Sequence, residues 1–560
     1  MGAASELVAA VVAPFGTSRG TTASTAATLR ILAAATAALG AGLLLAFASR
    51  RRPVAARGCG LLGPPGGEAD APEEQEDRGE PHADEGEVDL EELATSTVGA
   101  AGSFVEERGA RVSRRASRAS PASEGDRRAE LPGAQRVYVK TMGCAHNSSD
   151  AEFMMGLLQE YGYELVGALE DSDLCLVNSC TVKSPSQDSA TNLMKRARAA
   201  GKPVVLTGCV PSADSSVADG FEGVSLLGVT HIDRIVEVVE QTLLGNTVRM
   251  LGKRRELPSL DLPKVRRNKC VEIIPISGGC LGNCSYCKTK HARGKLSSYG
   301  AEAIVQRALL AASEGASEVW LASEDTGAWG IDLGTDIAAL LGRVADALPP
   351  GVMLKLGMTN PPYMLAHIGA VAEVLQRPNV FEFIHVPVQS GSDRVLQAMV
   401  REYTVADFSR LVDGLRGAVP GVLVATDIIC GFPTESEEDH EETLELVRRY
   451  KFPVLNISQF YPRPGTPAAR MKRLPGSLGK KRSSEVTQLF DSYETNRHLV
   501  GQELRAWFSE TETKHGQTVG HTKGYVKVVV PRDDGLLGRT ARVRVHGATK
   551  WHIEAEVVGA

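Results

Sequence analysis

The sequence has too few cysteines to be held together by disulfide bonds, with ten among 560 residues. This density excludes the small disulfide scaffolds of secreted proteins, in which cysteine exceeds about 8–10% of the chain. The cysteines fall in a close group or singly after apolar runs, which favours thiolate ligands in a reducing compartment. A chain this long cannot form a single core and predicts roughly three to four domains.

The sequence also lacks an excess of basic over acidic residues. The formal net charge is −6, which argues against a general affinity for nucleic acid. Much of the negative charge lies at residues 68–92, where Arg78 is the only lysine or arginine. The remainder of the chain is slightly basic, so RNA stays open as a partner.

Long apolar runs are scarce, and the one at residues 31–48 is followed by Arg50, Arg51 and Arg52. A helix of that length spans about 27 Å, enough for the hydrocarbon core of a bilayer. The positive-inside rule then predicts an anchor in the endoplasmic reticulum membrane, with the rest of the chain cytosolic. Two alternatives remain: a targeting peptide cleaved near Ala48 for an organelle, or an alanine-rich surface helix.

Three cysteines have the spacing C-x3-C-x2-C: Cys280, Cys284 and Cys287. A fourth ligand is missing, which argues against structural zinc, since such sites normally take four protein ligands. Three thiolates can instead hold three irons of a [4Fe-4S] cube and leave the fourth iron open to a substrate. The spacing alone leaves zinc and chance burial open.

Three further cysteines each follow a short apolar run with strand character. The runs are residues 137–141, 174–178 and 204–207, and the cysteines are Cys144, Cys180 and Cys209. Alternating strand and helix patterns predict a parallel sheet, here of flavodoxin-like type, whose strand ends meet at one edge. We expect these cysteines to converge there as ligands of an auxiliary [4Fe-4S] cluster.

Six strand patterns alternate with helix patterns in the middle of the chain. They lie at residues 271–276, 318–322, 353–357, 381–388, 422–431 and 455–461. The alternation predicts an open, partial (β/α)6 barrel with its chemistry at the carboxyl ends of the strands. Polar clusters at those ends suggest a cofactor pocket. Our candidate cofactor contacts there are Ser323, Glu324, Asp325, Gln389, Ser390, Gly391 and Ser392.

The tail after Leu499 carries runs of β-branched residues broken by glycine, which predicts a small antiparallel barrel. It is basic, through Lys523, Lys527, Arg532, Arg539, Arg542 and Arg544. Binding of RNA and a purely structural role are both open. A basic connector at residues 253–269 could either hold phosphates or serve as a plain linker.

These patterns divide the chain into six parts. They are a polar segment (1–30), a transmembrane helix (31–48), a disordered linker (49–132), the parallel-sheet domain (133–247), the partial barrel (265–495) and the basic barrel (497–560). The linker assignment depends on segregated charge and few large apolar residues.

Longer motifs carry a specific resemblance. With Tyr286 just before its third cysteine, the C-x3-C-x2-C loop resembles the signature of the radical S-adenosylmethionine superfamily. From residue 137 to the end the chain resembles the methylthiotransferases, with a radical S-adenosylmethionine barrel and a C-terminal TRAM domain. Four stretches are similar to the eukaryotic and archaeal branch that acts on N6-threonylcarbamoyladenosine in tRNA. They are residues 287–294, 358–363, 426–433 and 459–467.

The resemblance implies an activity. It implies two [4Fe-4S] clusters, S-adenosylmethionine as cofactor, with Tyr286 among its contacts, and methylthiolation of C2 of N6-threonylcarbamoyladenosine at position 37, 3′ of the anticodon. The auxiliary cluster carries the sulfur, and a second S-adenosylmethionine methylates it. An aromatic C–H has no acidic proton, so we assign no acid–base residue. The resemblance also implies an electron donor protein and a sulfur donor, neither identified by the residues.

Other functions remain open beside this one. A related enzyme could methylthiolate another tRNA base or a protein side chain, and a non-catalytic RNA-binding iron–sulfur protein would share the cysteines. Thr434 stands where the family pattern has glycine, and a β-branched residue there would be strained if its φ were positive.

Overall fold

The computed structural model describes residues 131–181, 184–214, 223–252, 254, 256–512 and 515–559. The predicted membrane segment at 31–48 lies outside the described residues, as does the predicted linker at 49–132 except for its last two residues. Among the described helices, none is long and apolar enough to cross a bilayer.

The first domain is a six-stranded parallel sheet in the order β2-β1-β3-β4-β5-β6. The central strands β3 and β4 are buried along their whole length, as expected for parallel strands covered on both faces. The first five strands have the flavodoxin-like order, which agrees with the predicted sheet. Its elements are β1 (Arg136–Thr141), α3 (Ala145–Tyr161), β2 (Glu164–Val166), β3 (Leu174–Ser179), α4 (Ser184–Ala199), β4 (Val204–Gly208), α5 (Cys209–Ala213), β5 (Ser225–Leu227), η2 (Val229–Arg234), α6 (Ile235–Leu243) and β6 (Arg249–Met250).

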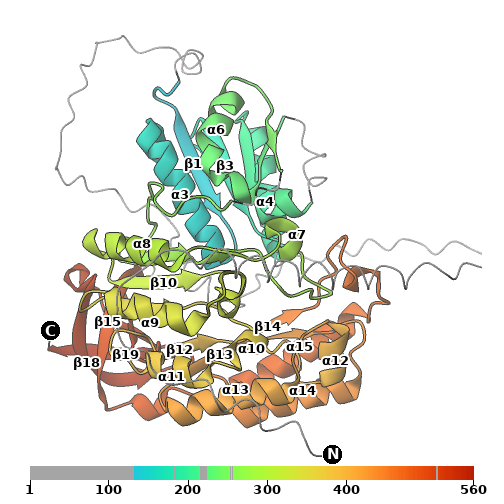
Figure 1. Cartoon of the computed structure of the whole chain (residues 1–560), viewed down its shortest axis with the longest axis vertical. Helices are drawn as coiled ribbons and strands as arrows, with labels where there is room; N and C mark the ends of the chain where they lie inside the picture. The colour runs from blue at the N-terminus through green and yellow to red at the C-terminus, as the bar shows by residue number, and fades with distance from the viewer. Residues whose placement is uncertain are drawn as a thin grey trace, which may run out of the picture. The chain divides into compact units, whose positions relative to one another are not determined.

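The middle of the chain forms an open barrel of six parallel strands (Figure 1). Two three-stranded sheets, β7-β10-β11 and β12-β13-β14, are joined where the amide of Phe381 donates to the carbonyl of Leu354 at 2.9 Å. All six strands fall where the sequence predicts them. They are β7 (Val271–Pro275), β10 (Glu318–Ala322), β11 (Met353–Leu356), β12 (Phe383–His385), β13 (Leu423–Cys430) and β14 (Val454–Gln459).

Helices cover the outer face of this barrel, as Figure 1 shows for α13, α14 and α15. Helix α14 begins with a capping box, in which the Ser436 hydroxyl and the Asp439 carboxylate accept from each other's backbone amides. The barrel helices are α7 (Thr289–Arg293), α8 (Ala301–Ser313), α9 (Ile337–Ala347), α10 (Pro361–Met364), α11 (Ile368–Leu375), α12 (Asp393–Ala398), α13 (Val405–Ala418), α14 (Glu437–Tyr450) and α15 (Gly476–Asp491).

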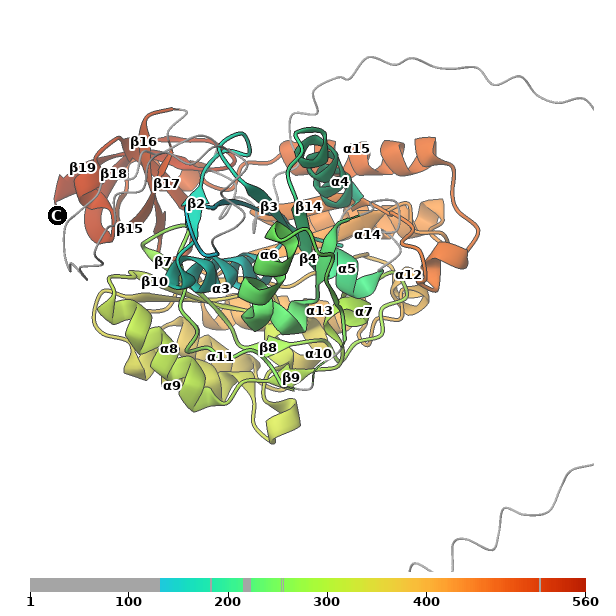
Figure 2. The ribbon, with the colours of Figure 1, turned by 90° about the horizontal axis from the view of Figure 1, so that it is seen from above.

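The last part of the chain is a closed five-stranded barrel, drawn in red in Figure 2. The β-branched runs at residues 526–530, 541–545 and 552–558 correspond to β17, β18 and β19. The sequence analysis misses β15 and β16, because these two neither alternate strictly nor contain a β-branched run. The strands are β15 (Glu503–Glu512), β16 (Gln517–Thr522), β17 (Lys527–Pro531), β18 (Arg539–Ala548) and β19 (Ile553–Gly559).

Tyr525, between β16 and β17, joins the two barrels. Its ring centroid lies 4.9 Å from that of Phe381 and 5.0 Å from that of Phe383, both inside the open barrel. The buried ammonium of Lys355 lies 4.4 Å from the same ring and 4.0 Å from Trp320. An aromatic layer with one cation therefore fills the open barrel below its carboxyl edge.

Replacing Tyr525 with alanine should lower the free energy of unfolding by about 3–5 kcal/mol, because a buried aromatic ring leaves a cavity. Chemical denaturation followed by tryptophan fluorescence measures the loss, since Trp320 and Trp507 lie in this layer. Trp551→Ala is the control: Trp551 is 53% exposed, so it should cost much less. Equal losses would contradict the assigned role of Tyr525.

Two cations of the basic connector at residues 253–269 form ion pairs with carboxylates of the folded chain. The Lys264 ammonium is 1% exposed and lies 2.9 Å from Glu272 and 3.2 Å from Glu152. Arg266 pairs with Glu314 at 2.7 Å. The prediction that this connector holds phosphates is therefore wrong for Lys264 and Arg266, because their charges are already neutralised by carboxylates.

Candidate active site

Three adjacent strands bring the first group of cysteines together. Strand β1 pairs with β3 and β3 with β4, all parallel. Cys144 caps α3 after β1, Cys180 follows β3, and Cys209 begins α5 after β4. We call these three the auxiliary trio. Their placement at one sheet edge agrees with the sequence argument.

Glycines before two of these cysteines allow the loops to approach each other. Gly143 has φ +94°, and a Cβ atom there would lie 2.5 Å from the Cys180 sulfur. Gly208 has φ +88°, and a Cβ there would lie 2.3 Å from the carbonyl oxygen of Ser179. A side chain at either position would push the cysteine loops apart.

Two buried asparagines tie the same loops. The amide group of Asn178 donates to the Asn147 carbonyl at 2.7 Å. The Asn147 side chain donates to the carbonyls of Met142 and Ser179 at 2.6 and 3.2 Å. The loops that carry Cys144 and Cys180 are therefore fixed by hydrogen bonds between neutral groups.

The second group, Cys280, Cys284 and Cys287, lies in the loop after β7, and we call it the radical trio. Two sulfurs already accept hydrogen bonds, from Thr289 N to Cys287 Sγ at 3.3 Å and from Arg401 Nη1 to Cys284 Sγ at 2.9 Å. Burial raises the pKa of Cys280 to about 12, with Asp325 and Cys284 adding to the shift. A thiolate there needs a compensating cation such as iron.

Both trios line one cavity of about 290 Å³. A Cβ at Gly282 would lie 3.7 and 3.8 Å from the sulfurs of Cys284 and Cys280, so glycine keeps that side open. In the described part of the chain, no three His, Cys, Asp or Glu side chains converge on a single point as ligands of one ion do. The thiolates of a [4Fe-4S] cube bind separate irons. Two groups of three thiols on one cavity fit such clusters.

Five of the predicted cofactor contacts also line this cavity: Tyr286, Ser323, Glu324, Asp325 and Gln389. Burial raises the pKa of Asp325 to about 6, against hydrogen bonds that favour its charged form. Those bonds come from the backbone amide and side chain of Asn360, at 3.1 and 2.7 Å. Asp325 is thus a fixed acceptor at the edge of the cavity.

The side chain of Glu324 is held by the first domain. Its Oε1 lies 3.0 Å from His146 Nδ1 and 2.9 Å from Arg293 Nε. Burial alone would raise the pKa of Glu324, but these two neighbours outweigh it and lower the pKa. The sequence groups Glu324 with cofactor contacts, whereas its structural partners are His146 and Arg293.

Within the described segment 389–392, Gln389 is the residue that lines the cavity. The Ser392 hydroxyl donates to Asp439 at 2.7 Å, and the Gly391 amide donates to Thr443 at 3.0 Å. Ser390 lies 3.4 Å from the same threonine hydroxyl. These contacts fix the turn against α14. The backbone of Gln389 itself has a positive φ of +70°.

Arg401 is a site residue that the sequence reading missed. Besides its bond to Cys284, its guanidinium donates to Asn360 and stacks 5.0 Å from the Tyr403 ring. It points inward because Val400 turns the chain at φ +56°, which is rare for a β-branched residue. The cofactor contacts predicted from the sequence are short polar clusters that follow strands, whereas Arg401 follows helix α12.

A second missed group lies on the inner faces of β12, β13 and β14. Asp427 accepts from Asn456 at 2.9 Å and lies 2.8 Å from His385 Nε2. All three line the cavity. Buried residues flank each of the three along its strand.

Thr434 is not strained. The described non-glycine residues with positive φ are Gln389, Val400, Lys451 and Tyr525, and Thr434 is not among them. The strain considered from the sequence therefore does not occur in this turn.

Comparisons with known proteins agree with these parts. Residues 136–226 match the uncharacterized protein family UPF0004, 274–447 the Radical SAM superfamily and 497–558 the TRAM domain. Threonylcarbamoyladenosine tRNA methylthiotransferase from Xenopus laevis is 49% identical over 76% of this chain and 78% of its own. The protein of the same name from Homo sapiens is 46% identical over 76% and 75%. The chain belongs to the threonylcarbamoyladenosine tRNA methylthiotransferase family.

A more distant likeness exists among solved structures. The radical S-adenosylmethionine methyltransferase TsrM from Kitasatospora setae has a TM-score of 0.45 and 15% identity, covering 60% of this chain and 77% of that one. Membership in the Radical SAM superfamily makes a [4Fe-4S] cluster and S-adenosylmethionine the cofactors of this methylthiotransferase.

Arg401→Gln should reduce cleavage of S-adenosylmethionine about 10- to 100-fold, because residues that support metal ligands typically contribute that much. The measurement is 5′-deoxyadenosine formed at several S-adenosylmethionine concentrations. Arg410→Gln is the control, since Arg410 lies exposed on α13 and pairs with Asp407. Equal rates for the two variants would contradict a role for Arg401 in the site.

Proposed function

We propose that this protein is a radical S-adenosylmethionine enzyme that methylthiolates C2 of N6-threonylcarbamoyladenosine, at position 37 of tRNA. The observation that carries the proposal is one cavity lined by two cysteine trios from two different sheets. A single trio would support radical formation alone. The second trio adds a site for the sulfur that the product requires.

The residues divide into two roles. Cys280, Cys284 and Cys287 would hold a [4Fe-4S] cluster, which would supply the electron for reductive cleavage of S-adenosylmethionine. Cys144, Cys180 and Cys209 would hold the auxiliary cluster. Each cluster would then have three cysteine ligands.

Polar groups around the radical trio orient the cofactor. The Arg401 guanidinium lies 2.9 Å from the Cys284 sulfur. From there it can bind the carboxylate of S-adenosylmethionine. Asp325, held by Asn360, can accept from hydroxyl or ammonium groups. Tyr286, Ser323 and Gln389 complete the contacts. The apolar and aromatic layer around Tyr525 keeps water out of the barrel from its other end.

The target base must leave its stack to enter this cavity, as a base in a single-stranded loop can. The C-terminal barrel supports binding of tRNA phosphates, although several of its cations are already paired. Arg532 lies 3.0 Å from Asp534, Arg544 lies 2.7 Å from Glu503, and Lys523 donates to backbone carbonyls. Lys527 lies 4.0 Å from Glu512, so the exposed Arg539 is the better candidate for a phosphate contact.

Mass spectrometry of digested tRNA tests the function. Cells that lack the protein should lose the 2-methylthio form of N6-threonylcarbamoyladenosine, and the purified enzyme should restore it. Unchanged nucleoside would refute the tRNA assignment. Loss of a methylthio group from a ribosomal protein instead would favour the protein-modifying alternative.

For the membrane segment we propose that residues 31–48 anchor the enzyme in the endoplasmic reticulum with its domains in the cytosol. Support comes from the 18 uncharged residues and the arginines that follow them. The full chain should then stay with membranes after carbonate washing, and deletion of residues 1–48 should release active enzyme. Release of the full chain by carbonate would contradict the anchor. A mature protein that begins near residue 49 would instead favour a cleaved targeting peptide.

A further inference from the structure

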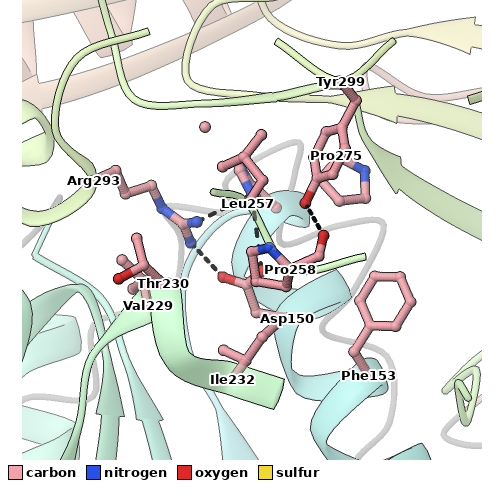
Figure 3. A pocket seen from close by; sticks show the side chains of 12 residues that line it. Asp150, Phe153, Val229, Thr230, Ile232, Leu257, Pro258, Pro275, Arg293 and Tyr299 are labelled. Carbon is pink, nitrogen blue, oxygen red and sulfur yellow. Dashed lines mark hydrogen bonds and ion pairs between the residues drawn. The ribbon is translucent and has the colours of Figure 1, made fainter. Parts of the chain in front are cut away.

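A buried ionic cluster lies between the auxiliary trio and the radical trio. Arg293, the last residue of α7, is 5% exposed, and its Nη2 donates to Asp150 of α3 at 2.6 Å. Its Nε lies 2.9 Å from Glu324, which follows β10. Figure 3 shows the guanidinium pointing toward Asp150. One side chain thus binds carboxylates from both domains.

His146 completes this cluster. Its Nε2 lies 3.0 Å from Nη1 of Arg293, and its Nδ1 lies 3.0 Å from Glu324 Oε1. Two carboxylates, those of Asp150 and Glu324, surround the Arg293 guanidinium. The two carboxylates fix the orientation of the Arg293 guanidinium, because Asp150 binds its Nη2 and Glu324 binds its Nε.

The same segment touches the auxiliary trio. Helix α5, which begins with Cys209, packs on α7, and Cys209 packs against Ala292. The Arg293 guanidinium is also near enough to Cys209 to lower the pKa of that thiol, against burial, which raises it. Lys288 at the other end of α7 pairs with Asp214 after α5, at 3.2 Å. The stretch directly after Cys287 is therefore the physical link between the two groups of cysteines.

We propose that Arg293 is a positioning residue that holds the auxiliary trio against the radical site and tunes the auxiliary cluster. The proposal rests on the proposed function, in which Cys209 is a ligand. A cation close to a ligand sulfur stabilises the more negative, reduced cluster, so it raises the reduction potential. Glu324 and Asp150 act through Arg293, because they fix its orientation.

A second buried arginine provides a matched control. Arg307 on α8 is 4% exposed, binds Glu272 at 3.0 Å and lies 5.6 Å from the ring of Phe153 on α3. It also stabilises the contact between the first domain and the barrel, but through β7 and away from the cysteines. Removing its charge weakens the domain contact without touching the auxiliary trio.

The test uses the full-length chain with Cys280, Cys284 and Cys287 all replaced by alanine, so that only the auxiliary cluster is loaded. Arg293→Gln, Arg293→Lys and Arg307→Gln are added separately. Iron and sulfide content, the EPR spectrum of the reduced cluster and its midpoint potential are measured. In the chain with both trios intact, methylthiolation is measured too, and Arg293→Gln should lower it about 10- to 100-fold.

We expect Arg293→Gln to keep about four irons per chain, to lower the midpoint potential and to change the EPR spectrum. Arg293→Lys should give a smaller shift, and Arg307→Gln none. An unchanged potential and spectrum in a loaded Arg293→Gln protein would overturn the inference, as would an equal shift in Arg307→Gln. A triple variant that holds no iron before any arginine is changed would overturn the proposed function itself.

Discussion

Replacing Cys280 with alanine should abolish formation of 5′-deoxyadenosine and, with it, all methylthiolation. Cys280, Cys284 and Cys287 lie on one short loop, where the structure brings them to the cavity with Arg401 and Asp325. Two remaining thiolates cannot hold a cube that needs three protein ligands and still leave one iron for the cofactor. Product 5′-deoxyadenosine is measured by liquid chromatography after anaerobic reduction.

Cys270→Ser is the control for that experiment. Cys270 lies just before β7, ten residues from Cys280, and lines a different cavity. The Cys270→Ser variant should cleave S-adenosylmethionine at the normal rate. Residual cleavage in Cys280→Ala above the level without enzyme would contradict the assignment of the radical trio.

Cys180→Ala should leave cleavage of S-adenosylmethionine in place but stop methylthiolation. Cys180 is buried directly after β3, in the first domain, and belongs to the auxiliary trio. Losing one of three ligands removes the auxiliary cluster and the sulfur it carries. The two readouts are 5′-deoxyadenosine and 2-methylthio nucleoside from the same reaction.

The matched control is Cys175→Ala, five residues earlier on the same strand. Cys175 is fully buried in the core of the first domain, and burial raises its pKa to about 12. This variant should keep both products, with some loss of stability from the cavity. Equal loss of cleavage and methylthiolation in Cys180→Ala would refute the separate roles of the two trios.

Several features of this protein were predictable because they are local in the sequence. The six cysteines stand after strand patterns or in one short loop, and parallel strands bring their carboxyl ends to the same edge. The capping box at Ser436 and Asp439 is likewise set within one turn of helix. The family motifs gave the reaction class without any tertiary information.

Other predictions failed where charge partners come from distant segments. Lys264 and Arg266 appear in the sequence as a basic run suited to phosphates. Glu272, a few residues further on, neutralises Lys264 together with Glu152, and Glu314 pairs with Arg266. Glu152 and Glu314 lie far away in the chain, and no spacing rule connects them to the basic run. The pair with Glu152 forms only when the first domain has docked on the barrel.

What the sequence determined by itself is which residues can bind clusters and which chemistry follows. The tertiary structure decided how the two trios share one cavity and which side chains support them. Arg401 reaches Cys284 through the turn at Val400, and Arg293 joins Asp150 to Glu324 across a domain contact. Both depend on side-chain directions that packing between distant segments imposes, and local residue preferences do not encode those directions.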